Sequence, residues 1–156
     1  MDLKQLYQDI ILEHGKNPRN FGKCEKYTHQ AKGYNPLCGD HVQVYLKLNN
    51  EKKVEDLTFE GSGCAISIAS TSIMTELVKG KSTEIAKKII IDFLNMVKST
   101  SEIKSNDLDE DQKMKVMSLS GVKKYPMRVK CATLAWHTLT SAIERKKEKV
   151  NTETID

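Results

Sequence analysis

The hydrophobic period changes once along the chain, from two residues to 3.6, and this change is the strongest constraint on the fold. Residues 41–48, HVQVYLKL, alternate between apolar and polar side chains, which is typical of a half-buried strand. Residues 54–60 give a second strand pattern after a turn at 49–52. Beyond residues 61–64, GSGC, the apolar positions recur with helical spacing. Strands followed by helices predict an α+β fold.

The same periodicities place the remaining elements. We expect helices over 3–14, 64–79, 83–98 and 113–121, a last helix that opens at Cys131, and a short edge strand over 28–33. Pro126 is expected to keep the stretch that follows it out of a helix, and the tail after Glu148 is expected to fray. The predicted sheet is small and antiparallel, with about three strands and with the helices packed on one side.

One stretch shows neither the strand nor the helix periodicity. Residues 99–112, STSEIKSNDLDEDQ, are polar and acidic, which predicts an exposed insertion or a mobile loop. The sequence shows no internal repeat and no domain linker. Residues 1–156 are therefore expected to form a single domain with an insertion around 99–112.

Length and charge limit what the chain can do. A chain of 156 residues buries about 70% of its unfolded surface, so a metal site would serve a function rather than make folding possible. The net charge of +4 comes from interleaved charges, as in residues 144–149, and only five Tyr, three Phe and one Trp are available for base stacking. We therefore expect no nucleic-acid binding. A mildly basic surface also suits an acidic protein partner.

The cysteines predict intracellular chemistry. No apolar run approaches the ~20 residues that a membrane span needs, and the chain starts directly with a helical pattern rather than a signal-peptide layout. The protein is therefore expected to be cytoplasmic and to have no membrane partner. Its four cysteines, Cys24, Cys38, Cys64 and Cys131, should then be reduced thiols. Cytosolic cysteines that matter are usually catalytic or bind a metal.

Three of these cysteines have similar surroundings. Cys38 lies in a Pro/Gly loop before a strand, Cys64 lies at a strand-to-helix junction, and Cys131 lies at the expected start of the last helix. The positive end of a helix dipole lowers the pKa of a thiol and favours the thiolate, which is both the nucleophile and the metal ligand. The three thiols can converge at one end of a small sheet, where Asp40 would add an oxygen ligand.

Such a set of ligands suits more than one group. Three sulfurs and one carboxylate match a tetrahedral zinc site, and they also match an iron–sulfur cluster. Because a carboxylate is a harder ligand than a fourth thiolate, the site is interpreted as exchangeable. Arg128 and Lys130 would offset its negative charge. The spacing contains no CxxC pair, so buried free cysteines stay an open alternative. Cys24 is interpreted as a plain loop thiol, and a role for His41 stays open.

Three motifs, in order along the chain, carry a family resemblance. They are Asn35-Pro36-Leu37-Cys38-Gly39-Asp40, then Gly61-Ser62-Gly63-Cys64-Ala65-Ile66-Ser67, then Arg128-Val129-Lys130-Cys131-Ala132-Thr133-Leu134-Ala135-Trp136. With them the chain closely resembles, over nearly its whole length, the IscU and NifU scaffolds of iron–sulfur cluster assembly. It is most similar to the SufU branch, because Lys130 occupies the place of an IscU ligand histidine. A protonated lysine cannot ligate a metal. The stretch 99–112 also fits the SufU insertion.

The resemblance implies an IscU/SufU-like fold and a zinc-dependent sulfurtransferase. By this resemblance zinc is held by Cys38, Asp40, Cys64 and Cys131. Cys38 accepts persulfide sulfur from a SufS-like, pyridoxal-phosphate cysteine desulfurase, one of whose histidines then replaces Cys38 on the metal. Downstream Suf scaffold proteins are further expected partners. Arg128 is expected to stabilise local negative charge or to help dock the desulfurase.

Two alternatives stay open at this point. The first is a scaffold that assembles [2Fe–2S] clusters on the same three cysteines and Asp40, although Lys130 argues against it. The second is a non-enzymatic zinc module that only docks a partner. In that case Cys38→Ser would keep the stimulation of the partner as long as fold and metal survive.

Overall fold

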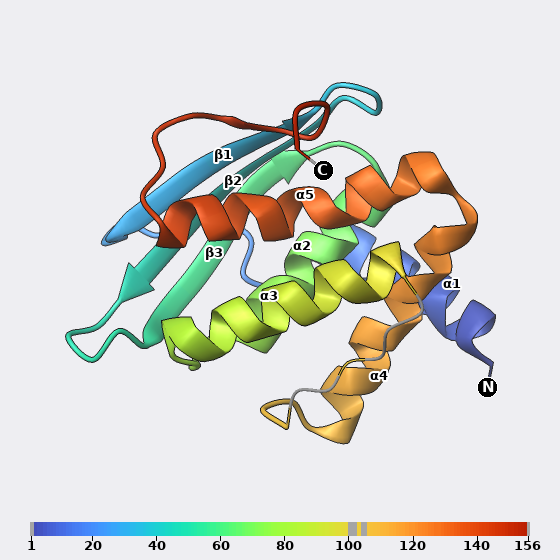
Figure 1. Ribbon diagram of the computed structural model, residues 1–156, viewed down its shortest axis with the longest axis horizontal. Coiled ribbons are helices and arrows are strands. Elements are labelled where there is room, and N and C mark those ends of the chain that lie inside the picture. Colours follow the sequence, from blue (N-terminus) through green and yellow to red (C-terminus); the bar gives the residue numbers. More distant parts are fainter. Residues whose placement is uncertain (1, 100–102, 104–105, 156) are drawn as a thin grey trace.

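The chain folds into a four-stranded sheet with its helices on one side (Figure 1). The structure is a computed structural model that describes residues 2–99, 103 and 106–155. Its elements are α1 (Leu3–Lys16), β1 (His29–Asn35), β2 (Asp40–Leu48), β3 (Val54–Ser62), α2 (Ala65–Val78), α3 (Thr83–Lys98), α4 (Glu110–Ser118), η1 (Leu119–Lys124), α5 (Pro126–Ile143) and β4 (Val150–Asn151). The predicted α+β class with helices on one face is confirmed. Within the described residues, no helix is both long and apolar enough to cross a membrane.

The sheet has one strand more than predicted, and it is mixed rather than antiparallel. Its order is β3-β2-β1-β4, with antiparallel pairs except for β4, which runs parallel to β1 at Gly33–Tyr34. The strand expected at the edge therefore lies inside the sheet, and the tail expected to fray supplies the fourth strand. Two residues are too few to show a period of two, so the sequence pattern could not indicate β4.

The last helix begins earlier than predicted. α5 starts at Pro126, which occupies the first turn, where the missing N–H of proline leaves no hydrogen bond unmade. The prediction that Cys131 opens this helix is therefore wrong, because Cys131 lies in the second turn. The dipole of a helix acts mainly at its first turn, so that argument does not apply to Cys131. It does apply to Cys64, which is the N-cap residue of α2.

The acidic stretch 99–112 contains the N-terminus of α4. Asp109 caps α4 through a capping box with Gln112, so α4 begins three residues before the expected 113, and η1 carries the helical path on to Lys124. Leu108 is buried although it lies in the polar run. Of the expected insertion at 99–112, residues 100–102 and 104–105 lie outside the described residues.

α5 joins the sheet to the other helices. It packs over β1 and β2 on one side and against α2 and α3 on the other. Trp136 of α5 is fully buried and stacks on Phe93 of α3, with 4.0 Å between the ring centroids. Its indole N–H donates to Ser70 Oγ of α2 at 2.9 Å, so this polar atom is satisfied in the core. The packing fixes α5, and with it Cys131, relative to the sheet.

Gly33 of β1 sets how closely α5 approaches the sheet. A Cβ atom at this position would collide with Thr138 Oγ1 and would lie 2.9 Å from Leu134 Cδ1, both on α5. We expect Gly33→Ala to lower the free energy of unfolding by about 1–3 kcal/mol, the usual cost of overpacking, as measured by urea denaturation. Adding Thr138→Ala should recover part of the loss. Wild-type stability of Gly33→Ala would contradict this account of the packing.

Candidate metal centre

Three separate segments bring sulfur and oxygen ligands to one end of the sheet. One ligand atom each from Cys38, Asp40 and Cys131 lies within 4.8 Å of the other two. The Sγ atoms of Cys38 and Cys131 are 3.2 Å apart. Cys64 Sγ lies 3.9 Å from Asp40 Oδ2, beside this group rather than in it. The structure thus gathers all four residues singled out as ligands.

The turn that carries Cys38 is the tip of a β-hairpin. Asn35 and Asp40 are the last paired residues of β1 and β2, so the turn consists of the four residues 36–39. Gly39 has φ +68°, a left-handed conformation that glycine adopts without steric cost. Cys38 is half-buried at the tip, whereas Asp40 and Cys131 are fully buried. Cys38 is therefore more accessible than either of them.

Asp40 is a buried carboxylate held by hydrogen bonds. Its Oδ1 accepts the backbone N–H of Cys64 at 2.8 Å, and its Oδ2 accepts the side-chain amide of Asn35 at 3.0 Å. Within the described residues no lysine, arginine or histidine forms a salt bridge with it. A buried carboxylate without a cation is costly. A metal ion among the neighbouring thiols would supply the missing positive charge.

Gly63 allows this arrangement. Its φ is +138°, and a Cβ atom there would overlap Asp40 Oδ1 and lie 2.8 Å from Asp40 Cα. Only a residue without a side chain lets the backbone before α2 come this close. The N-cap residue Cys64 can then donate its N–H to the carboxylate.

The Cys64 and Cys131 thiols shift each other's pKa in opposite directions. A hydrogen bond with Cys131 lowers the pKa of the Cys64 thiol to about 7. The hydrogen bond with Cys64 and burial together raise the pKa of Cys131. Because thiolates are the ligand form, binding of a metal would release any proton that these two thiols carry.

Arg128 places a positive charge at the accessible cysteine. Its Nη1 lies 3.7 Å from Cys38 Sγ, and the side chain is exposed in the first turn of α5. A nearby cation stabilises a thiolate. This position agrees with the charge-supporting role expected from the sequence, and it leaves the guanidinium open to solvent.

Two residues that the sequence did not assign to the site support it. Asn35 is fully buried, and its amide also donates to Cys131 Sγ at 3.4 Å. Thr152, in the C-terminal segment, donates to Asn35 Oδ1 at 2.9 Å. Asn35 could have been found, since it begins the motif that contains Cys38. Nothing in the pattern around Thr152 indicates its position.

The remaining candidates lie elsewhere. Lys130 turns away from the ligands and pairs with Glu153 at 2.8 Å. His41 is exposed and stacks on Tyr34, with 4.6 Å between ring centroids. Cys24 is buried in the segment before β1, and it does not belong to the ligand group found among the described residues.

The donor set fits a tetrahedral zinc site. Zinc takes thiolate and carboxylate ligands in combinations of four. Here two sulfurs and one buried carboxylate lie around one point, and the third sulfur, that of Cys64, lies 3.9 Å from the same carboxylate. Iron–sulfur clusters also bind through cysteine thiolates, so the ligand types alone do not separate the two groups. Cys38 and Cys64 are half-buried, whereas Asp40 and Cys131 are fully buried.

Comparison with known proteins gives a consistent result. Residues 6–132 match the family model described as the NifU-like N-terminal domain. The chain is 38% identical over 146 residues, which is 94% of its length and 95% of the relative, to a zinc-dependent sulfurtransferase SufU of Bacillus subtilis. It is 38% identical over 143 residues, 92% of its length and 86% of the relative, to an iron–sulfur cluster assembly scaffold protein IscU of Streptococcus pyogenes.

A solved structure shows the same architecture. It is the crystal structure of a SUF-system iron–sulfur cluster assembly scaffold protein from Fervidobacterium islandicum AW-1. The TM-score is 0.78 at 36% sequence identity, and the match covers 89% of this chain and 97% of the other. Sequence and fold therefore agree on the same group of proteins.

Proposed function

The chain belongs to the NifU-like N-terminal domain family, which includes the SufU- and IscU-type proteins of iron–sulfur cluster assembly, and we propose that it acts there as a zinc-dependent sulfurtransferase. In this proposal Cys38 accepts persulfide sulfur from a SufS-like cysteine desulfurase. Cys38, Asp40, Cys64 and Cys131 hold the metal. The name of the Bacillus subtilis relative supports this reading.

The position of Cys38 is the observation that carries the proposal. A persulfide on another protein is too large to reach a buried thiol. Cys131 is fully buried in the second turn of α5, whereas Cys38 is half-buried at the tip of a hairpin. Arg128, 3.7 Å from its sulfur, favours the thiolate that must attack. Burial therefore excludes Cys131. Of the two half-buried thiols, Cys38 and Cys64, we place the acceptor at Cys38, which lies at the hairpin tip beside Arg128.

The transfer itself needs no oxidant or reductant. The Cys38 thiolate attacks the terminal sulfur of the donor persulfide, so that a new S–S bond forms as the donor S–S bond breaks. The donor cysteine leaves as a thiolate, and Cys38 keeps the transferred sulfur as its own persulfide. Zinc, when bound, supplies a redox-inert positive charge that holds the thiols as thiolates. Asp40, anchored by two hydrogen bonds, keeps its place when Cys38 moves.

A second function has support of its own. Several relatives, including the Streptococcus pyogenes protein, are named as IscU scaffolds, and the same three cysteines and Asp40 suit a [2Fe–2S] cluster. In this alternative the cluster is the cargo that the protein assembles and passes on. Lys130 offers no further ligand, because its ammonium group is engaged with Glu153.

Titration of a desulfurase separates the two functions. The zinc-loaded protein is added in substoichiometric amounts to a SufS-like cysteine desulfurase with cysteine and reductant, and alanine production is measured. A catalytic sulfur acceptor should raise turnover by about 10-fold or more, because each molecule accepts sulfur repeatedly. If turnover stays unchanged, and a visible cluster forms when iron and sulfide are supplied, the scaffold function replaces the proposal.

A further inference from the structure

The C-terminal segment returns to the metal centre. We call residues 150–153 the C-terminal clasp. Val150 and Asn151 form β4 beside Gly33 and Tyr34 of β1, and the backbone N–H of Thr152 donates to Tyr34 O at 3.1 Å. Tyr34 directly precedes Asn35, so this pairing brings the clasp to the last residue of the strand that leads into the hairpin turn.

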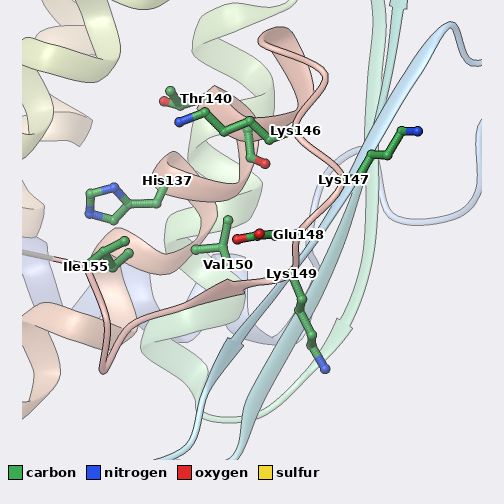
Figure 2. A pocket seen from close by; sticks show the side chains of 9 residues that line it. His137, Thr140, Lys146, Lys147, Glu148, Lys149, Val150 and Ile155 are labelled. Carbon is green, nitrogen blue, oxygen red and sulfur yellow. The ribbon is translucent and has the colours of Figure 1, made fainter.

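The clasp is held at a few points rather than by continuous packing. A cavity of about 650 Å³ lies between the C-terminal half of α5 and the chain around the clasp. Figure 2 shows His137 of α5, together with Val150 and Ile155 of the C-terminal segment, among the residues that line this cavity. The polar contacts of the clasp with the rest of the chain are therefore concentrated at β4, at Thr152, and at the ion pair of Glu153 with Lys130.

Of these contacts, the one at Thr152 reaches the ligands. Its hydroxyl donates to Asn35 Oδ1 at 2.9 Å, and both side chains are buried. The ion pair of Glu153 is partly exposed, and exposed ion pairs contribute little. A buried carbonyl oxygen left without a donor, in contrast, costs the full desolvation of that group. Thr152 therefore favours the orientation in which Asn35 turns its oxygen towards the clasp.

This orientation decides what Asn35 offers to the metal centre. With Oδ1 on the clasp, the amide Nδ2 donates to Asp40 Oδ2 at 3.0 Å and to Cys131 Sγ at 3.4 Å. A flipped amide would place its oxygen against the Asp40 carboxylate, so that two acceptors would face each other with no hydrogen between them. Donation to the ligands spreads their negative charge and holds them in place for the metal.

We propose that Thr152 is a positioning residue of the metal centre, which fixes the amide of Asn35 and thereby slows the loss of the metal. The inference rests on the proposed metal-binding function. It makes the clasp, 86 residues or more beyond the first three ligand positions, part of the site that those positions form. Partners of metal ligands typically change metal affinity by about 10–100-fold when they are removed.

The test compares the rate at which a chromophoric chelator removes zinc from the full-length protein. Thr152→Val removes the hydroxyl at nearly constant volume and should speed zinc loss by about 10-fold. Thr152→Ser keeps the hydroxyl and should stay within about twofold of the wild type. Thr154→Val is the matched control, because among the described residues the Thr154 hydroxyl donates to the backbone carbonyl of Asn151 and to no metal-centre residue. It should also stay within about twofold.

A second readout detects the ligands directly. In cobalt-substituted protein, the thiolate-to-cobalt absorption bands should shift in Thr152→Val and keep their wild-type position in Thr154→Val. Zinc loss from Thr152→Val at the wild-type rate would overturn the inference, and so would equally fast loss from Thr152→Ser. If Thr152→Val does not fold, Thr152→Ala takes its place with the same expected outcomes.

Failure of the inference about Thr152 can be distinguished from failure of the proposed metal-binding function. If the wild type takes up neither zinc nor cobalt, the proposed function falls. The clasp is then tested in the metal-free protein by hydrogen exchange of the Asn35 side-chain amide. Slow exchange in the wild type and in Thr154→Val, and fast exchange in Thr152→Val, would support the clasp. Equal exchange in all three would overturn it.

Discussion

Cys38→Ala is expected to abolish sulfur transfer, with a loss of at least about 100-fold in the stimulation of the desulfurase. The nucleophile is then missing, and the remaining thiols do not replace it. Cys131 is fully buried, so a persulfide on a second protein cannot reach its sulfur. Cys64 lies at the start of α2, next to Asp40 rather than at the exposed hairpin tip.

The measurement is alanine production together with mass spectrometry of the protein after one turnover. The wild type should gain the mass of one sulfur atom on the peptide that contains Cys38, and Cys38→Ala should gain none. Cys24→Ala is the matched control, since it removes a thiol from a buried position outside the ligand group. It should be stimulated and modified like the wild type.

The zinc content of each variant has to be measured together with its activity. Cys38→Ala keeps three of the four ligands, so the fold and part of the metal should survive, as circular dichroism and metal analysis can show. Full stimulation by a folded Cys38→Ala would contradict sulfur acceptance at this residue and would favour a module that only docks. If Cys38→Ala loses the stimulation but is also unfolded, the experiment is repeated with Cys38→Ser, which preserves volume and polarity.

Much of the fold was predictable because its elements follow strong periodicities. The alternation in β2 and the helical spacing in α3 placed both elements to within one residue. The mistakes fell where local signals are ambiguous. Pro126 was interpreted as a breaker, but proline at the first helical turn starts a helix instead of ending it. The two-residue strand β4 depends on pairing with β1, a contact that no local pattern records.

The sequence pointed to the four residues that the fold brings to one end of the sheet, but not to the residues that hydrogen-bond to them. Cys38, Asp40 and Cys64 lie in segments rich in Gly and Pro, and such segments often present functional side chains. Cys131 was singled out for the wrong reason, since the helix start lies five residues before it. Asn35 and Thr152 act through tertiary hydrogen bonds. The contact of Thr152 with Asn35 spans 117 residues, and no local sequence pattern records it.

Gly63→Ala is expected to damage the metal centre almost as severely as removal of a ligand. The new Cβ atom would overlap Asp40 Oδ1 and press on Asp40 Cα at 2.8 Å. The Asp40 backbone cannot shift easily, because Asp40 is buried and belongs to β2. Its side-chain carboxylate must therefore rotate away and lose its hydrogen bond with the N–H of Cys64. We expect zinc affinity to fall by about 100-fold, as measured by competition with a chelator of known affinity.

Part of any effect of Gly63→Ala comes from backbone strain alone, and the chain contains a control for it. Gly22 has φ +134°, close to the +138° of Gly63, but a Cβ atom there would meet nothing within 4 Å. Gly22→Ala should therefore lose stability by about 1–3 kcal/mol and keep wild-type zinc affinity. If both variants bind zinc equally well, the contact between Gly63 and Asp40 does not shape the site. A loss confined to Gly63→Ala would show that the close approach of the α2 start to Asp40 builds the metal centre.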